Sequence, residues 1–118
     1  MKPEARKYLY DIWRAVELLT EFTADKAFQD YERDAMLRAA VERQFEIVGE
    51  AIAQLASFDQ ETARRIGEYR RIVAFRNILI HGYADVDDRL VWDVVETKLP
   101  ILRRDVEGLL KEAGIMPS

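Results

Sequence analysis

Chain-breaking residues are scarce in this sequence, and the long stretches between them carry apolar residues at intervals of three and four. Five glycines and three prolines are spread over 118 residues. No segment alternates strictly between apolar and polar residues from one turn signal to the next, which is the pattern of a half-buried strand. Intervals of three and four instead place apolar side chains on one face of an α-helix. The sequence therefore predicts an all-α fold.

Caps and breakers divide the chain into about four to five predicted helices. They are expected over residues 3–22, 30–57, 59–65, 69–81 and 89–113, with a short turn or helical loop at 23–29. Asp59 is the expected N-cap of the short helix and Gly67 is its expected stop. Gly82 is the expected stop of the next helix. An Asp within 85–88 should cap the last helix, which Pro100 must kink or divide and Gly114 should end.

Composition limits the class of protein. The chain is 49% hydrophobic and 34% charged, as expected for one globular domain over residues 1–118. It has no cysteine, which excludes disulfide frameworks, thiolate zinc sites and cysteine nucleophiles. The net charge of -4 argues against polyanion binding over the whole surface. With no signal peptide and no apolar run long enough for a membrane span, a soluble cytoplasmic protein is expected.

One polar cluster stands out near the end of the helix predicted at 69–81. It contains Arg76, Asn77 and the single histidine, His81, followed by Gly82 and Tyr83. A histidine near a helix C-terminus can simply favour the negative end of the helix dipole. At about 100° per residue, Arg76 and His81 point about 140° apart on one helix. A shared site therefore requires that the helix end before His81, or that two protomers pool residues across a two-fold interface.

Residues 76–83 read Arg-Asn-Ile-Leu-Ile-His-Gly-Tyr and match the pattern Arg-x4-His-x-Tyr. With this motif the chain resembles the HepT-like branch of the HEPN ribonuclease superfamily. Residues 40–51 are similar to that family's second-helix segment ending in Gly-Glu-Ala, and residues 85–87, 91–92 and 99–100 also fit. The resemblance covers nearly the whole chain and implies a HEPN-like antiparallel helical bundle that forms a homodimer.

The resemblance also implies a function: a metal-independent endoribonuclease that needs no cofactor and acts as the toxin of a type VII toxin–antitoxin system. Metal-free cleavage requires a base for the ribose 2′-hydroxyl, an acid for the leaving 5′-oxygen and a cation for the charge on the phosphate. His81 is the candidate acid or base, and Arg76 is the candidate cation. RNA is the expected substrate, with transfer RNA and messenger RNA among the candidates.

Two further residues of the motif have alternative roles. Asn77 is a candidate for positioning the substrate or the His81 tautomer, and equally for a solvated amide near the helix end. Tyr83 is a core or interface residue, an RNA contact or, as the resemblance implies, the hydroxyl that receives AMP from a partner. That partner would be a minimal nucleotidyltransferase antitoxin of the MntA kind, either with the homodimer alone or in a larger hetero-oligomer. The added phosphate would oppose RNA binding.

Other interpretations of the sequence remain open. The chain could be a non-catalytic nucleotide-binding or adaptor subunit of a nucleotidyltransferase complex, or a plain helical interaction module. The further arginines between residues 64 and 71 could extend a phosphate-binding surface or pair with nearby acids. Gly49, a glycine inside a helix, indicates close approach by another helix, and Glu50 could line the site or pair with an arginine. The aromatic residues at helical spacing are most simply core or dimer contacts: Trp13, Phe45, Phe75 and Trp92.

Overall fold

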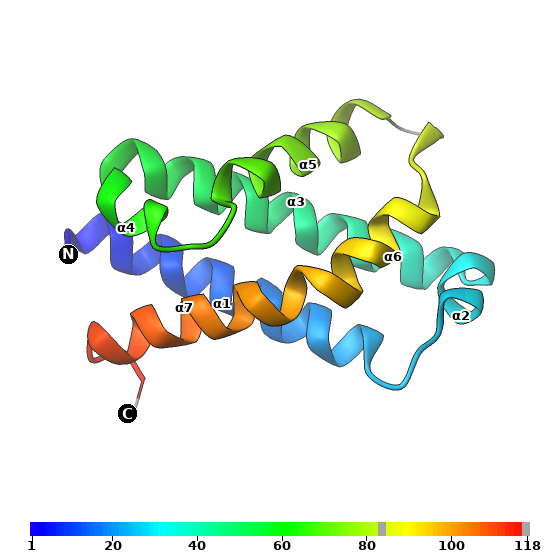
Figure 1. Ribbon diagram of the computed structural model, residues 1–118, viewed down its shortest axis with the longest axis horizontal. Coiled ribbons are helices and arrows are strands. Elements are labelled where there is room, and N and C mark those ends of the chain that lie inside the picture. Colours follow the sequence, from blue (N-terminus) through cyan, green and yellow to red (C-terminus); the bar gives the residue numbers. More distant parts are fainter. Residues whose placement is uncertain (83–84, 117–118) are drawn as a thin grey trace.

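The computed structural model describes residues 1–82 and 85–116, and these residues form an antiparallel bundle of α-helices (Figure 1). The seven helices are α1 (Pro3–Thr23), α2 (Phe28–Arg33), α3 (Ala35–Phe58), α4 (Gln60–Arg64), α5 (Tyr69–Gly82), α6 (Asp88–Thr97) and α7 (Leu99–Glu112). No strand occurs in these residues. The all-α prediction is confirmed.

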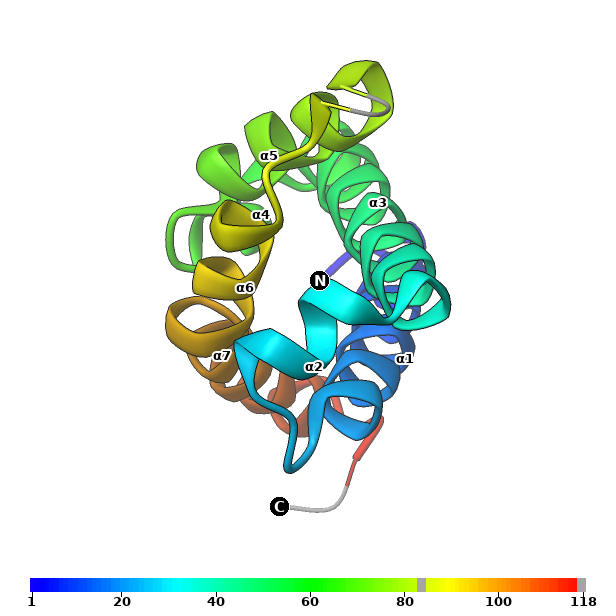
Figure 2. The same ribbon diagram turned by 90° about the vertical axis from the view of Figure 1, so that its right-hand side faces the viewer.

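Four long elements alternate in direction along the bundle: α1, α3, α5 and the pair α6 and α7 (Figure 1). The main contacts join α3 to both α1 and α5, and α1 to α7, and the end-on view shows α5 and α7 on separate sides of the bundle (Figure 2). The core is continuous through all four elements and consists of aliphatic side chains with a few aromatic ones. The helix α5, which carries the polar cluster, packs with one face against α3.

The beginning of the second predicted helix was wrong. The chain forms α2 from Phe28, breaks at Asp34 and then starts α3, instead of running continuously from Asp30. Asp34 has an extended backbone, and its Oδ1 accepts a hydrogen bond from the N–H of Leu37 at 3.1 Å, as an N-cap does. The separate short helix lets Tyr31 lie fully buried against Trp92, with ring centroids 5.3 Å apart. Tertiary packing therefore outweighs the helical periodicity here.

The other caps fall close to their predicted positions. Asp59 caps α4 by accepting from Thr62, and Asp87 caps α6 by accepting from Arg89. Pro100 stands in the first turn of α7, so the last predicted helix is divided at Lys98. Gly114, with φ of 74°, follows the end of α7.

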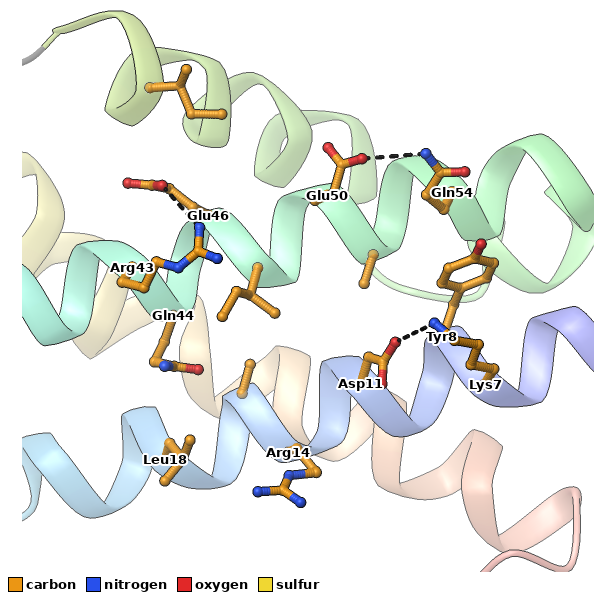
Figure 3. Close-up of a pocket in the computed structure, with 14 residues that line it drawn as sticks. Lys7, Tyr8, Asp11, Arg14, Leu18, Arg43, Gln44, Glu46, Glu50 and Gln54 are labelled. Atoms are coloured by element: carbon orange, nitrogen blue, oxygen red, sulfur yellow. Dashed lines mark hydrogen bonds and ion pairs between the residues drawn. The ribbon is translucent and has the colours of Figure 1, made fainter.

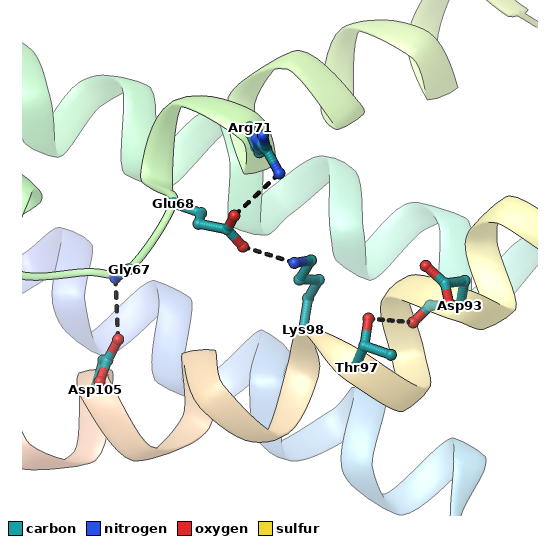
Figure 4. A network of polar contacts seen from close by, with 7 residues as sticks. All are labelled: Gly67, Glu68, Arg71, Asp93, Thr97, Lys98 and Asp105. Atoms are coloured by element: carbon teal, nitrogen blue, oxygen red, sulfur yellow. Dashed lines mark hydrogen bonds and ion pairs between the residues drawn. The ribbon is translucent and has the colours of Figure 1, made fainter.

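Gly67 has a different role from the predicted one, because α4 already ends at Arg64 and the residue with positive φ is Glu68, at 55°. The N–H of Gly67 donates to Asp105 Oδ2 at 2.9 Å (Figure 4). The connection between α4 and α5 is thus tied to α7.

Candidate functional site

The described part of the polar cluster lies on α5, whose faces differ in exposure. Ile72, Phe75 and Leu79 are buried in the core, whereas Asn77 and His81 are exposed. Arg76 is intermediate, with its side chain 20% exposed. This is the distribution expected from helical geometry, since Arg76 lies about one residue's rotation from Phe75 and toward α3.

Gly49 on α3 makes room for Arg76. A Cβ built on Gly49 would overlap the Arg76 Cβ and would lie 2.8 Å from its Cγ, closer than real Cβ contacts. The backbone of α3 therefore packs directly on the first carbons of the arginine side chain. The close helix approach predicted from the glycine is confirmed, and it brings Glu50 next to Arg76.

Two acceptors hold the Arg76 guanidinium. Its Nη1 donates to Asn77 Oδ1 at 2.8 Å, and its Nη2 forms a hydrogen-bonded ion pair with Glu50 Oε2. Its Nε is buried and has no hydrogen-bond acceptor among the described residues. Glu50 is the site residue that sequence reasoning left undecided. The signal that points to it is its position directly after the glycine of the helix crossing.

His81 does not meet Arg76 within this chain. The helix α5 continues through His81 to Gly82, so the possibility that it ends before His81 was wrong. On a regular helix the two side chains keep their divergence of about 140°. Asn77 lies on the exposed side of α5 with His81, and its Oδ1 accepts a hydrogen bond from Arg76. Tyr83, the remaining residue of the motif, lies outside the described residues.

A cavity of about 570 Å³ lies between α1 and α3 (Figure 3). It adjoins the ion pair of Arg76 with Glu50, because Glu50 is one of its lining residues. Glu50 and Ile80 form part of its lining, beside side chains of both charge signs. Two of its ion pairs are internal to a helix, Lys7 with Asp11 at 3.1 Å and Arg43 with Glu46 at 3.5 Å. The charges in this groove largely neutralise each other, so it is not a basic channel.

A second groove, of about 420 Å³, separates α5 from α6 and α7 and is mainly apolar. Ile78, Leu90 and Ile101 line it and are 47%, 39% and 42% exposed. At the end where α5 begins, Glu68 bridges Lys98 at 2.7 Å and Arg71 at 3.1 Å (Figure 4). The Lys98 ammonium group holds the pKa of the Glu68 carboxyl below its usual value. This groove is an exposed apolar surface beside the His81 side of α5.

Among the described residues, two of the four further arginines between residues 64 and 71 have acidic partners. Arg65 pairs with Glu112 and Arg71 with Glu68, and the Arg70 guanidinium lies 5.4 Å from the centre of the Tyr69 ring. These contacts favour the interpretation of a paired helix surface over an extended phosphate-binding surface. The predicted core role of the aromatic residues holds for Phe45, Phe75 and Trp92, which are buried, while Trp13 is partly buried against the core.

No group of three or more histidine, aspartate and glutamate side chains is arranged to hold a metal ion in residues 1–82 and 85–116. Over the same ranges, no helix has the length and apolarity needed to cross a membrane. Asp87, one of the aspartates within residues 85–88, serves as the cap of α6, as expected.

Comparison with protein families identifies the fold family. The family described as "Ribonuclease HepT-like" matches residues 12–109, a span that includes α3, α5 and the Arg76 ion pair. The chain belongs to the ribonuclease HepT-like family. The match contains both Arg76 and His81 and confirms the family resemblance carried by the motif.

Similar proteins carry ribonuclease names. "Probable ribonuclease HepT" of Thermococcus cleftensis is 36% identical over 111 residues, which are 94% of this chain and 100% of that protein. "Putative RNase MJ1380" of Methanocaldococcus jannaschii is 33% identical over 106 residues, or 90% of this chain and 96% of its own length.

A longer protein of M. jannaschii, "Gamma-glutamylcyclotransferase and putative RNase MJ0434", is 34% identical over 112 residues. The aligned region covers 95% of this HepT-like chain but only 50% of that relative. No solved structure gave a significant match.

Proposed function

We propose that this HepT-like chain is a metal-independent endoribonuclease in which Arg76 and His81 are the catalytic residues. The observation that carries the proposal is a largely buried arginine, held by two acceptors, five residues before the single histidine in a chain of this family. The ribonuclease names of relatives that align over almost their whole length support the same reaction class.

In the proposed reaction, the ribose 2′-oxygen attacks the adjacent phosphorus while a base takes the proton of the 2′-hydroxyl. A 2′-O–P bond forms, the P–O5′ bond breaks, and the 5′-oxygen leaves with a proton from an acid, which gives a 2′,3′-cyclic phosphate and a 5′-hydroxyl. An imidazole performs either proton transfer near neutral pH. The planar guanidinium of Arg76 stabilises the charge on the phosphate oxygens.

We propose further that the working unit is a homodimer, because one protomer separates Arg76 from His81. A two-fold axis beside α5 would bring Arg76 of one protomer near His81 of its partner. We assign to the second copy the exposed face of α5, which carries Asn77 and His81, together with the apolar groove that separates α5 from α6 and α7. Exposed aliphatic side chains there, Ile78 and Leu90 among them, are otherwise left in water.

The biological role we propose is that of a cytoplasmic toxin paired with a minimal nucleotidyltransferase antitoxin. The antitoxin would silence the ribonuclease by transferring AMP from ATP to the Tyr83 hydroxyl. The tyrosine oxygen bonds to the α-phosphorus, pyrophosphate leaves, and the hydroxyl proton passes to solvent. The family motif supports this step, and the negative charge of the adduct would oppose an RNA phosphate.

The test is RNA cleavage by the purified chain in excess EDTA, with total RNA and purified transfer RNA as substrates. Arg76→Ala and His81→Ala are compared with Arg33→Ala, a control in which an exposed arginine paired with Asp30 on α2 is lost. We expect cleavage by the wild type and the control, products with cyclic phosphate ends, and none from the two motif variants. An uncleaved substrate with a folded wild-type dimer would instead favour a nucleotide-binding or adaptor subunit.

A further inference from the structure

Glu50 is the acidic partner of the proposed catalytic arginine, although it lies outside the motif. Its carboxylate is anchored on both oxygens: Oε1 accepts from Gln54 Nε2 at 3.2 Å, and Oε2 accepts from Arg76 Nη2 (Figure 3 shows the Gln54 contact). Gln54 lies one turn further along α3, so the carboxylate has support from its own helix. The Glu50 side chain is itself 55% exposed, whereas that of Arg76 is 20% exposed.

The Arg76 side chain is fixed at each end. Its first carbons pack on Gly49, and its terminal nitrogens bond to Asn77 and Glu50. A guanidinium has five N–H donors. Within residues 1–82 and 85–116, two of these donors are engaged by Asn77 and Glu50 and the one on Nε is buried without a partner, which leaves two on the terminal nitrogens for a phosphate. Without the carboxylate, Asn77 would be the one acceptor for the guanidinium group in the part of the chain that the structure describes.

We infer that Glu50 is a positioning residue that holds the Arg76 guanidinium in the orientation in which its two remaining donors face the scissile phosphate. The inference rests on the proposed ribonuclease function. Glu50 touches neither substrate nor reacting atoms and acts through Arg76. The negative charge of Glu50 weakens the attraction of Arg76 for a phosphate. The benefit of Glu50 for the reaction therefore comes from the orientation that it gives the guanidinium. The loss of Glu50 should therefore lower kcat and leave KM unchanged or reduced.

The kinetic test compares Glu50→Ala with Glu50→Gln, whose amide oxygen can accept the same hydrogen bond. The control is Glu112→Ala, which removes a glutamate of nearly equal exposure, 57%, from its ion pair with Arg65. We expect kcat to fall by about 10- to 100-fold in Glu50→Ala, the size of effect that a misplaced catalytic group produces. Glu50→Gln should restore most of kcat, and Glu112→Ala should match the wild type.

A second measurement is independent of RNA cleavage. The Arg76 Nε–H is buried, so its resonance should be resolved in a ¹H–¹⁵N spectrum of arginine side chains. We expect a high ¹⁵N heteronuclear NOE for this group in the wild type and Glu50→Gln and a low one in Glu50→Ala. This comparison decides whether Glu50 holds Arg76, whether or not the wild type cleaves RNA. A wild type that cleaves no RNA would overturn only the ribonuclease proposal.

Two results would overturn the inference. One is an Arg76 NOE that stays high in Glu50→Ala, because the carboxylate would then not restrain the guanidinium. The other is a higher kcat/KM in both Glu50 variants through a lower KM, because the carboxylate would then compete with the phosphate for Arg76. Thermal unfolding of each variant separates these outcomes from a general loss of folding.

Discussion

Gly49 on α3 and Arg76 on α5 are packed so closely that a methyl group on the glycine would occupy the space of the arginine Cβ. The contact joins a structural requirement to the candidate site, because the residue after Gly49 supplies the carboxylate that pairs with Arg76. A helix glycine usually reduces stability by about 1 kcal/mol relative to alanine. Here the absence of a side chain is what allows the helices to meet.

The first prediction compares two helix glycines. Gly49→Ala should destabilise the protein by roughly 1 to 2 kcal/mol, because the overlap with Arg76 outweighs the gain in helix propensity. Gly108→Ala on α7 should stabilise it by up to about 1 kcal/mol, since beyond the adjoining residues and backbone of its own helix nothing lies within 4 Å of the added carbon. Urea unfolding measures both. If both substitutions stabilised the protein, the close packing at Gly49 would be wrong.

The sequence predicted this contact because a glycine inside a strongly helical pattern has few other uses. It also predicted the caps at Asp59 and Gly114, where the local chain chemistry decides the structure. It failed at Asp34, because the break there depends on burial of Tyr31 against Trp92, a residue far away in the chain. Local periodicity carries no information about such a partner.

The same division applies to the site. The motif identified Arg76 and His81 as candidate residues. The helical repeat predicted that their side chains point in different directions on one helix. The ion pair of Glu50 with Arg76 could not be derived, because it depends on how α3 crosses α5. Whether α5 continued past His81 was equally open, since a glycine at position 82 allows a stop either there or slightly earlier.

The second prediction concerns pH. Burial of the Glu42 carboxyl raises its pKa above the usual value, and the nearby carboxylates of Asp88 and Glu46 raise it further, against the opposing effect of Arg38. The folded protein therefore binds a proton more readily than the unfolded chain does. The contribution of Glu42 to stability consequently falls as pH rises through the interval from its ordinary pKa to its raised one.

Glu42→Gln removes this effect. Relative to the wild type, the variant should gain about 0.2 to 0.5 kcal/mol at pH 7, the usual size of a like-charge interaction four residues apart on a helix. The gain should vanish below the ordinary pKa of the glutamate, where both proteins carry a neutral group. Thermal unfolding from pH 3 to 8 measures the trend, with Glu21→Gln as an exposed control on α1. A gain that is independent of pH would contradict the prediction.

The third prediction tests the proposed dimer surface. Ile78→Asp replaces an aliphatic side chain, 47% exposed at the apolar groove beside α5, with a charged carboxylate. If the second copy covers this groove, the variant should be a folded monomer in light scattering after size exclusion and should lose RNA cleavage. Met36→Asp, at a methionine that is 82% exposed at the start of α3, should remain dimeric and active. A dimeric and active Ile78→Asp protein would place the interface elsewhere.

The fourth prediction asks whether one site uses residues of two protomers. Arg76→Ala and His81→Ala are each expected to be inactive, but the mixed dimer would contain one site with both residues intact. Random exchange makes half of the dimers mixed, and each has one intact site out of two, so mixing equal amounts should restore about one quarter of wild-type cleavage. Exchange is achieved by co-refolding, and differently tagged chains allow purification of the mixed dimer. If Arg76 and His81 instead act within one chain, no mixture regains cleavage, because neither chain carries both residues.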